Sequence, residues 1–256
     1  YLEGSVKGLI AHWKFDGNLV DEISSLALTP INSAIYQDGI FNKGLTTDGN
    51  KFIIESSTLR NLVDGNTWTI SFWINIAVPE TSSTMIYLSR FDSSAAANGL
   101  RGGFNVAVMG SSHGTYPGKL RFERLYDSAT WSTNYTTFSF NNYLNKWVNC
   151  VIVCFATGFS VYMNGSLDST VTHNSSWVAT QRFTGTAYEN QIGIGGLFMH
   201  SGWGSSTNDG HGDIDDLRFY DRELSAEEVE KLYYAQYIQK GSISGSTDKY
   251  IAFKYN

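Results

Sequence analysis

Short runs of apolar residues recur along the chain, and Gly, Asn, Asp or Ser separates most of them. Within many runs the apolar residues alternate with polar ones, which is the pattern of a β-strand with one buried face. Regularly spaced strands of this kind favour an antiparallel sandwich or jelly roll over βαβ units. The pattern therefore predicts an all-β fold with strands at residues 9–15, 51–55, 67–76, 84–90, 103–108, 119–125, 136–140, 146–155, 159–163, 167–172, 191–194 and 212–220.

Two segments carry further local information. Asn164-Gly165 lies between two strand-like runs and predicts a type I′ hairpin turn, because both central positions of that turn need positive φ. The run 148–155 is apolar at both parities, which predicts a strand covered on both faces. Its cysteines, Cys150 and Cys154, would lie about 13 Å apart along an extended strand, too far for a disulfide, so we expect free buried thiols.

One helix is predicted near the end of the chain. Ser225-Ala-Glu-Glu228 has the spacing of a capping box, in which each of the two side chains binds the other residue's backbone amide. Val229, Leu232 and Tyr233 follow at spacings of three and four residues. This spacing gives a helix with one apolar side that can pack on a sheet.

The chain divides into one domain and a tail. The helical pattern fades after residue 236 into a Gly- and Ser-rich stretch, and residues 250–255 alternate again like a strand. We therefore expect a domain over residues 1–235 and a linker-like tail or edge strand over residues 236–256. The sequence begins at Tyr1 without Met or a signal segment, so either a leader was removed or it is part of a longer protein.

Charge and composition exclude two classes of partner. The chain has 18 Lys+Arg against 24 Asp+Glu, a formal net charge of −6, and its basic residues are not clustered. Nucleic-acid-binding proteins present basic clusters, so nucleic acid is not an expected partner. The longest purely apolar run, residues 150–156, is far shorter than a bilayer span, so membrane insertion is not expected either.

Five segments stand out by their sequence: residues 8–18, 43–49, 68–74, 161–165 and 212–222. Together they resemble the signatures of laminin-G-like domains, which have the concanavalin-A-like lectin/glucanase fold. The resemblance implies a jelly-roll sandwich of two antiparallel sheets with a short C-terminal helix. It also implies glycan binding and an extracellular place, or a place on a cell or virion surface. The matching segments occur in the family's order: Gly8-Leu-Ile-Ala-His-Trp-Lys-Phe-Asp-Gly-Asn18, Lys43-Gly-Leu-Thr-Thr-Asp-Gly49, Trp68-Thr-Ile-Ser-Phe-Trp-Ile74, Val161-Tyr-Met-Asn-Gly165 and Gly212-Asp-Ile-Asp-Asp-Leu-Arg-Phe-Tyr-Asp-Arg222.

Asp215 is the most informative single residue. It shares strand parity with Leu217 and Phe219, which are expected to face the core, whereas Asp216 is expected to face the other way. A carboxylate at the edge of a core needs a cation or hydrogen bonds to offset its burial.

The resemblance implies a structural Ca²⁺ at this position, joining the last long strand to the first strand and its loop. Calcium takes six to eight hard oxygen ligands. The side chains implied as ligands are Asp16, Asn18, Asp48 and Asp215. The alternative is that Asp215 accepts backbone amides without a metal.

Glycan binding requires exposed aromatic rings that stack on sugar faces, together with amides and carboxylates for the hydroxyls. Trp68, Trp73 and Trp147 fall in signature strands and are expected to pack inside the sandwich. The remaining candidates lie in a polar stretch and in a Gly- and Ser-rich insertion, where a tryptophan that covers the core is the alternative. The predicted ligand-binding residues are Trp131, Trp203, Asn208, Asp209 and His211.

Sequence motifs for catalysis are missing. The chain has no Gly-rich phosphate loop, nucleophile elbow or His-Glu-x-x-His motif, and it lacks the Glu-x-Asp-x-x-Glu strand of the glucanases. We therefore expect a non-catalytic extracellular or surface module for carbohydrate binding or adhesion, whose partner is a glycan or polysaccharide. The alternative is a structural or assembly protein of a virion, fibre or cell surface that uses the scaffold to contact other protein chains.

Overall fold

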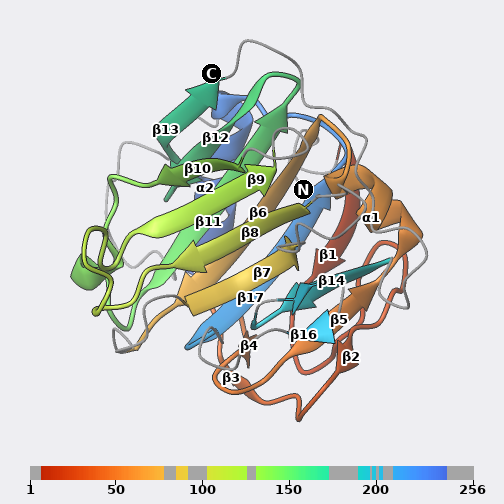
Figure 1. Ribbon diagram of the computed structural model, residues 1–256. Coiled ribbons are helices and arrows are strands. Elements are labelled where there is room, and N and C mark those ends of the chain that lie inside the picture. Colours follow the sequence, from red (N-terminus) through yellow and green to blue (C-terminus); the bar gives the residue numbers. More distant parts are fainter. Residues whose placement is uncertain are drawn as a thin grey trace.

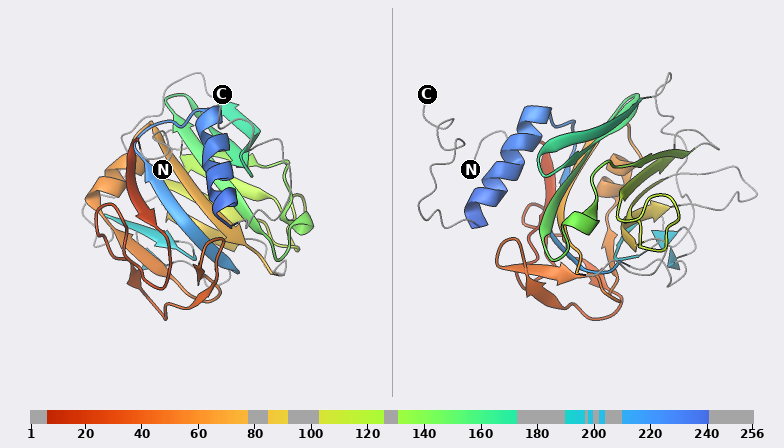
Figure 2. Two further views of the ribbon diagram at one scale, coloured as in Figure 1. Left: turned by 180° about the vertical axis from the view of Figure 1, so that it is seen from behind. Right: turned by 90° about the vertical axis from the view of Figure 1, so that its left-hand side faces the viewer.

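The computed structural model describes residues 7–77, 85–91, 103–125, 131–172, 190–196, 198–199, 202–203 and 210–240. Within these ranges the protein consists of two β-sheets that lie face to face, and the helix α2 packs on the outside of one of them (Figures 1 and 2). The predicted all-β jelly-roll sandwich with a C-terminal helix is confirmed.

Each of the two sheets combines strands from distant parts of the chain. Sheet I has the order β13 (Ser166–Thr172), β12 (Gly158–Met163), β11 (Trp147–Phe155), β6 (Trp68–Asn75), β17 (Asp213–Tyr220), β4 (Lys43–Thr46) and β3 (Tyr36–Asp38), and β1 (Leu9–Trp13) also pairs with β17. Sheet II has the order β10 (Trp131–Tyr135), β9 (Leu120–Leu125), β8 (Gly103–Val108), β7 (Met85–Phe91), β14 (Gln191–Ile194), β5 (Phe52–Glu55) and β2 (Thr29–Pro30), with β15 (Phe198–Met199) and β16 (Gly202–Trp203) beside β7. The helices are α1 (Ser57–Val63), the 3₁₀ turn η2 (Phe140–Asn142) and α2 (Ala226–Lys240).

The facing sides of the sheets form the main core. Alternate residues of each strand point into it, so that β6 contributes Trp68, Ile70 and Phe72 while β8 contributes Phe104 and Val106. All five are fully buried. Burying a large apolar side chain contributes about 1.5–3 kcal/mol, so these alternating positions hold the two sheets together.

A second apolar cluster lies between sheet I and α2. Val151 and Val153 of β11 and Tyr220 of β17 pack there against Val229 and Leu232 of the helix. Figure 2 shows α2 crossing the outer face of sheet I. The prediction that the strand over 148–155 is covered on both faces is therefore confirmed. No helix in the described ranges combines the length and apolar character that crossing a bilayer requires.

Several local predictions are also confirmed. Cys150 and Cys154 are free and buried, and burial raises the pKa of Cys154 to about 12, which keeps the thiol protonated and inert. Asn164 and Gly165 have φ values of 49° and 77°, as the hairpin turn between β12 and β13 requires. A Cβ on Gly165 would lie 2.9 Å from the Tyr233 side chain, so the turn also needs glycine for space.

The predicted strand at residues 136–140 is wrong. The strand β10 ends at Tyr135, because the Thr136 hydroxyl accepts the amide of Leu120 and donates to the carbonyl of Phe138. The amide of Thr136 still donates to the carbonyl of Leu120, but the Thr136 side chain takes the return bond of the ladder, and Phe140 then begins η2.

The sequence pattern also missed the short elements. Helix α1 begins after Ser56, whose side chain accepts the amide of Leu59, a cap that the strand-oriented interpretation overlooked. The short strands β2, β3, β4, β15 and β16 have two to four residues each, too few to show an alternation.

The capping box at the start of α2 is confirmed. The Ser225 hydroxyl accepts the amide of Glu228 at 3.2 Å, and the Glu228 carboxylate accepts the amide of Ser225 at 2.8 Å. Both terminal nitrogens of Arg222 also donate to Glu228 at 2.8 Å. These hydrogen bonds lower the pKa of Glu228 to about 2, and the bonds from Arg222 have the largest effect. The helix continues to Lys240, beyond the domain boundary expected at residue 235.

Glu228→Gln is expected to remove a pH-dependent contribution to stability. The folded-state pKa lies below the ordinary value of 4.5, so the contribution is present above that pH and is lost as the pH falls toward 2. The variant should be less stable at pH 7 by about 1 kcal/mol or less, because solvent still screens this partly exposed surface pair. Urea unfolding at pH 7 and near pH 2 measures the difference, with the exposed Glu230→Gln as control. A deficit of the same size at both pH values would contradict this explanation.

Candidate functional site

The outer side of sheet II is polar. On β8 and β9 the residues that face the core alternate with residues that face outward, as the pleat of a strand requires. Figure 1 shows these strands in front, on the side opposite α2. We call the outward set, with two residues of β10 in register with it, the polar face: Asn105, Arg121, Glu123, Thr133 and Tyr135.

A charged pair lies in the middle of the polar face. Arg121 and Glu123 are two residues apart on β9, and their Nη2 and Oε2 atoms are 3.1 Å apart. Each side chain is only 16% exposed. The hydroxyl of Thr133 donates to the other carboxylate oxygen of Glu123 at 3.3 Å. Burial raises the pKa of Glu123, while Arg121 and Thr133 act in the opposite direction.

An aromatic stack borders this pair. Tyr135 packs over Ala107 and Met109, and the ring of Tyr116 lies parallel to it, with 3.9 Å between centroids and 15° between planes. His113 lies within 5.9 Å and 6.1 Å of the two rings. Tyr116 is 39% exposed, so one aromatic surface remains accessible at this end of the polar face.

The loop between β8 and β9 positions Tyr116. His113 Nδ1 accepts the amide of Tyr116 at 3.1 Å, and the carbonyl of Tyr116 accepts the amide of Lys119. Gly118 closes the loop with φ of 73°, where a Cβ would lie 2.6 Å from the side chain of Asn141. The tyrosine ring is thus held by its own turn as well as by Tyr135.

Three buried polar atoms on this side of sheet II have no hydrogen-bond partner among the described residues. They are Oδ1 of Asn105, Nε of Arg121 and Oε1 of Gln191. Asn105 lies in register with Glu123, and Gln191 begins β14. An unpaired buried polar atom costs about 1–3 kcal/mol, so a ligand that supplies the missing bonds would bind here favourably.

The residues predicted to bind glycan lie at different places. Trp131 begins β10 and pairs with Leu125, and Trp203 pairs with Phe198 in β16, so both belong to strands associated with sheet II. Asn208 and Asp209 lie outside the described residues.

His211 lies at one end of the sandwich and contacts Asp48. Its Nδ1 is 3.0 Å from Oδ1 of Asp48, and its carbonyl accepts the hydroxyl of Tyr87 at 2.6 Å. The backbone beside it packs tightly, since a Cβ on Gly212 would lie 2.2 Å from the carbonyl of Asn75. His211, which is predicted to bind glycan, therefore contacts Asp48, which is predicted to bind the metal.

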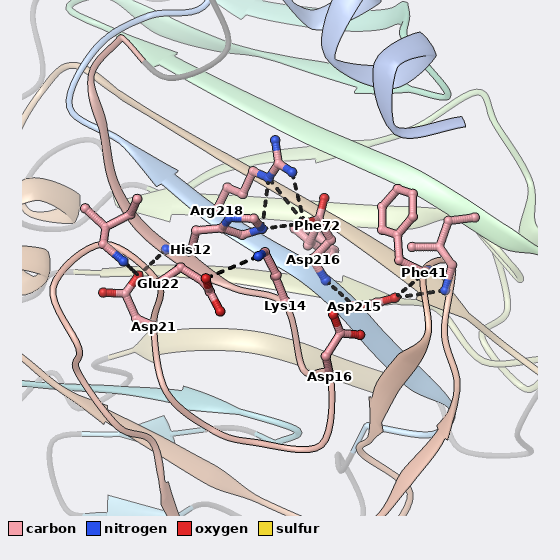
Figure 3. Close-up of polar contacts among 12 residues, drawn as sticks. His12, Lys14, Asp16, Asp21, Glu22, Phe41, Phe72, Asp215, Asp216 and Arg218 are labelled. Atoms are coloured by element: carbon pink, nitrogen blue, oxygen red, sulfur yellow. Dashed lines mark hydrogen bonds and ion pairs between the residues drawn. The ribbon is translucent and has the colours of Figure 1, made fainter. Parts of the chain in front are cut away.

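Two of the four predicted metal ligands bind one loop, residues 39–43 (Figure 3). Asp215 Oδ2 accepts the amides at positions 40 and 41, at 2.8 Å and 3.3 Å. Asp16 accepts the amide and the side-chain nitrogen at positions 43 and 42, both at 3.2 Å. Asn18 instead accepts the amide of Val20, and Asp48 binds His211. Across the described ranges, no three His, Cys, Asp or Glu side chains gather as a metal site.

Asp215 is a buried carboxylate that backbone amides hold in place. The carboxylate is fully buried, and its hydrogen-bond partners are three backbone amides. Burial, followed by the charge of Asp216, raises the pKa of Asp215 to about 8 against the effect of these amides. A Cβ on Gly39 would lie 2.4 Å from the carbonyl oxygen of Phe41 and 2.5 Å from both Asp215 Oδ2 and the carbonyl carbon of Lys43, so the loop packs closely against Asp215. The backbone amides that the alternative interpretation assigned to Asp215 are present.

The expected direction of Asp215, toward the core, is wrong, whereas Asp216 faces away from the core as expected. The register of β17 against β6 shifts between Asp215 and Arg218, and Asp216 has φ of 51°. This β-bulge reverses the parity, so that Asp215 pairs with Trp73 on the outer face of sheet I while Leu217 faces the core. The sequence shows the alternation but not the extra residue.

Asp216 is the centre of a buried charge cluster (Figure 3). Its carboxylate is 2.5 Å from Nε2 of His12 and 3.1 Å from Nη2 of Arg218. Burial raises the pKa of Asp216, but Arg218 and His12 outweigh it and hold the pKa below its ordinary value. Since His12 lies on β1, the cluster ties the first strand to β17.

The sequence analysis missed Asn105, Glu123 and Tyr116. The alternations Phe104-Asn105-Val106 and Arg121-Phe122-Glu123 would have identified the first two as outward-facing. No sequence signal places Tyr116 on Tyr135, because that contact depends on how a loop folds over the neighbouring strand.

The chain matches one family model and is similar to several solved structures. The family model described as the concanavalin A-like lectin/glucanases superfamily matches residues 48–230, well over half of the chain. No curated protein matches the sequence closely enough to count as a relative. Domain 4 of an extracellular arabinanase from Geobacillus stearothermophilus, solved with arabinotriose, is similar in structure with a TM-score of 0.63 and 17% identity. The match covers 88% of this chain and 98% of that domain.

The binding domains of botulinum neurotoxin serotypes D and G are similar as well. Both have TM-scores of 0.63, at 16% and 18% identity, and the matches cover 91% and 89% of this chain. They cover 52% and 51% of the toxin domains, so the chain spans about half of their length. At these identities the likeness shows the fold alone.

Asp216→Asn is expected to destabilise the fold by about 3 kcal/mol, because it leaves the buried Arg218 without its carboxylate. Asparagine tolerates the positive φ of this position, so the loss of stability measures the removal of the charge rather than strain in the backbone. Chemical unfolding measures it, with the exposed Asp221→Asn as control. A loss below about 1 kcal/mol, the size of an exposed ion pair, would contradict a stabilising role for the cluster.

Proposed function

The chain belongs to the concanavalin A-like lectin/glucanase superfamily, and from this premise we propose that it is a carbohydrate-binding module that performs no chemistry. The proposed ligand is a glycan or polysaccharide on the polar face of sheet II. The exposed ring of Tyr116 stacks on a sugar, while Asn105, Arg121 and Glu123 bind hydroxyl groups. The proposed place of action is outside the cell or on a cell or virion surface.

One observation carries this proposal. A shielded charged pair, three unpartnered polar atoms and an accessible aromatic ring all lie on the outer side of sheet II. The outer side of sheet I is in part occupied by α2. The combination of amide, carboxylate and aromatic groups on one face is what sugar recognition uses.

The separation of carboxylates supports binding without hydrolysis. Glycosidases need two carboxyl groups about 5–9.5 Å apart. On the described outer side of sheet II, Glu123 lies on β9 and Glu55 lies on β5, four strand spacings away. That distance is about 19 Å, too long for the two groups to act on one bond.

Two comparisons support the ligand class and the location. The similar arabinanase domain was solved with arabinotriose and belongs to an extracellular enzyme. The similar neurotoxin structures are binding domains. These similarities support the proposal of an extracellular or surface binding module.

Tyr116→Ala is expected to weaken glycan binding about tenfold, because a stacked ring contributes about 0.5–1.5 kcal/mol. Tyr116 is partly exposed in a loop, so its removal should lower the melting temperature by only a few degrees, through loss of its stack on Tyr135. Glycan-array screening followed by calorimetric titration of the strongest binder measures the effect. Leu167→Ala is the control, since Leu167 is 56% exposed on β13 of the opposite sheet.

The absence of binding to every glycan on the array would overturn this proposal. Light scattering of the same sample then tests the alternative function in assembly. A stable oligomer without glycan binding would favour contacts with other protein chains.

We also propose that the chain binds a structural Ca²⁺ beside Asp215. Asp215 and Asp16 supply carboxylate oxygens and the loop 39–43 supplies the carbonyl oxygen of Phe41, all of the donor type that calcium prefers. The cation would offset the cost of the buried carboxylate and fix the loop to β17. Its role is structural, since the ligands lie on sheet I and the polar face lies on sheet II.

Calcium is expected to raise the melting temperature by roughly 5–10 °C relative to chelator, since a ligand at a hundred times its Kd contributes about 2.7 kcal/mol. Asp215→Asn should abolish the response. Asp48→Asn should keep it, because Asp48 binds His211 at another place. Differential scanning calorimetry measures all three proteins, and an equal melting temperature of the parent protein with calcium and with chelator contradicts the proposal.

A further inference from the structure

The polar face pairs its own charges, and we propose that it selects neutral glycan chains over chains that carry carboxylate or sulfate groups. This inference rests on the proposed function of the same face and adds the chemical class of its ligand. It is carried by the juxtaposition of the Arg121–Glu123 pair with the unpartnered atoms of Asn105 and Gln191.

Among the described residues of the polar face, the charged pair leaves no free cation for an acidic sugar. Arg121 already contacts Glu123 at 3.1 Å, and both side chains are 16% exposed. An acidic group brought to Arg121 also approaches the Glu123 carboxylate, and a like charge placed against it costs several kcal/mol. The repulsion opposes the attraction, so a negative charge on the ligand brings no net gain.

The unpartnered atoms point to the same conclusion. Asn105 Oδ1 and Gln191 Oε1 are acceptors, whereas Arg121 Nε is a donor. A sugar hydroxyl both donates and accepts, so hydroxyl groups can satisfy all three atoms. Carboxylate and sulfate groups only accept, and they cannot serve the two amide oxygens. The face therefore needs a ligand rich in hydroxyl groups.

The spacing of these atoms favours a chain over a single sugar. Arg121 lies on β9 and Gln191 lies on β14, with β8 and β7 between them. Three strand spacings correspond to about 14 Å. Tyr116 stacks on Tyr135 of β10, the strand next to β9, which adds an aromatic group beside this row. Several linked sugar units are needed to reach all of these groups.

The test uses the full chain and matched ligands. An array that pairs neutral glycans with uronate-bearing and sulfated counterparts identifies the strongest binder, and calorimetry gives Kd for it and for its acidic counterpart. We expect the neutral chain to bind at least about tenfold more tightly, with little change between low and high salt. Equal or tighter binding of the acidic chain overturns this inference and leaves the proposed function standing. No binding to any glycan overturns both.

Two variants test the role of charge. Glu123→Gln leaves Arg121 unpaired, and Thr133→Lys adds a cation at an exposed position beside Glu123. Each is expected to raise the affinity for the acidic chain about tenfold at low salt, and high salt should remove the gain. An unchanged ratio of neutral to acidic affinity in both variants overturns the inference.

The double variant Arg121→Gln with Glu123→Gln is the matched control. It removes both charges and keeps the face neutral, so it should retain the preference for the neutral chain. Thermal unfolding of every variant separates loss of fold from loss of selectivity, and Thr133→Lys carries the test if Glu123→Gln fails to fold. Acidic binding by the double variant equal to that of Glu123→Gln would overturn the role assigned to charge.

Discussion

Strand β17 joins the beginning of the domain to its end, and its bulge makes this possible. Along one side β17 pairs with β6, and along the other it pairs first with β4, through Ile214, and then with β1, from Leu217 onward. The bulge lies where the neighbour changes. It directs Asp215 to the loop 39–43 and Asp216 to His12 of β1. Because these carboxylates are buried, each must keep its partners, and the cost of losing one exceeds that of an ordinary surface contact.

This arrangement decides which surface remains for recognition. Once β17 leaves sheet I, the chain turns into α2, and the capping box at Ser225 and Glu228 sets where the helix starts. The helix then lies on the outer face of sheet I and covers Val151 and Val153. Sheet II carries its own polar residues outward on the side away from α2. The same chain path thus covers one outer face with a helix and leaves the polar face on the other side.

The candidate site was only partly predictable. Asn105 and Glu123 face outward by simple alternation, and the sequence contained that information. Their juxtaposition with Arg121 and Thr133 depends on the pairing of β8, β9 and β10, which the expected strand at 136–140 misplaced. A one-residue error in register moves every side chain to the other face, so no pattern within single strands could assemble the site. Trp131 and Trp203 were chosen as loop residues, and the structure places both in strands.

The sequence by itself determined the all-β class, most of the strands, the hairpin at Asn164, the buried thiols and the capped helix. These features follow from contacts between residues close in the chain, or from a burial pattern that repeats every two residues. Tertiary structure alone decided the direction of Asp215, the cluster around Asp216 and the stack of Tyr116 on Tyr135. Each of these depends on an inserted residue or on a partner from a distant strand, and hydrophobic alternation carries information about neither.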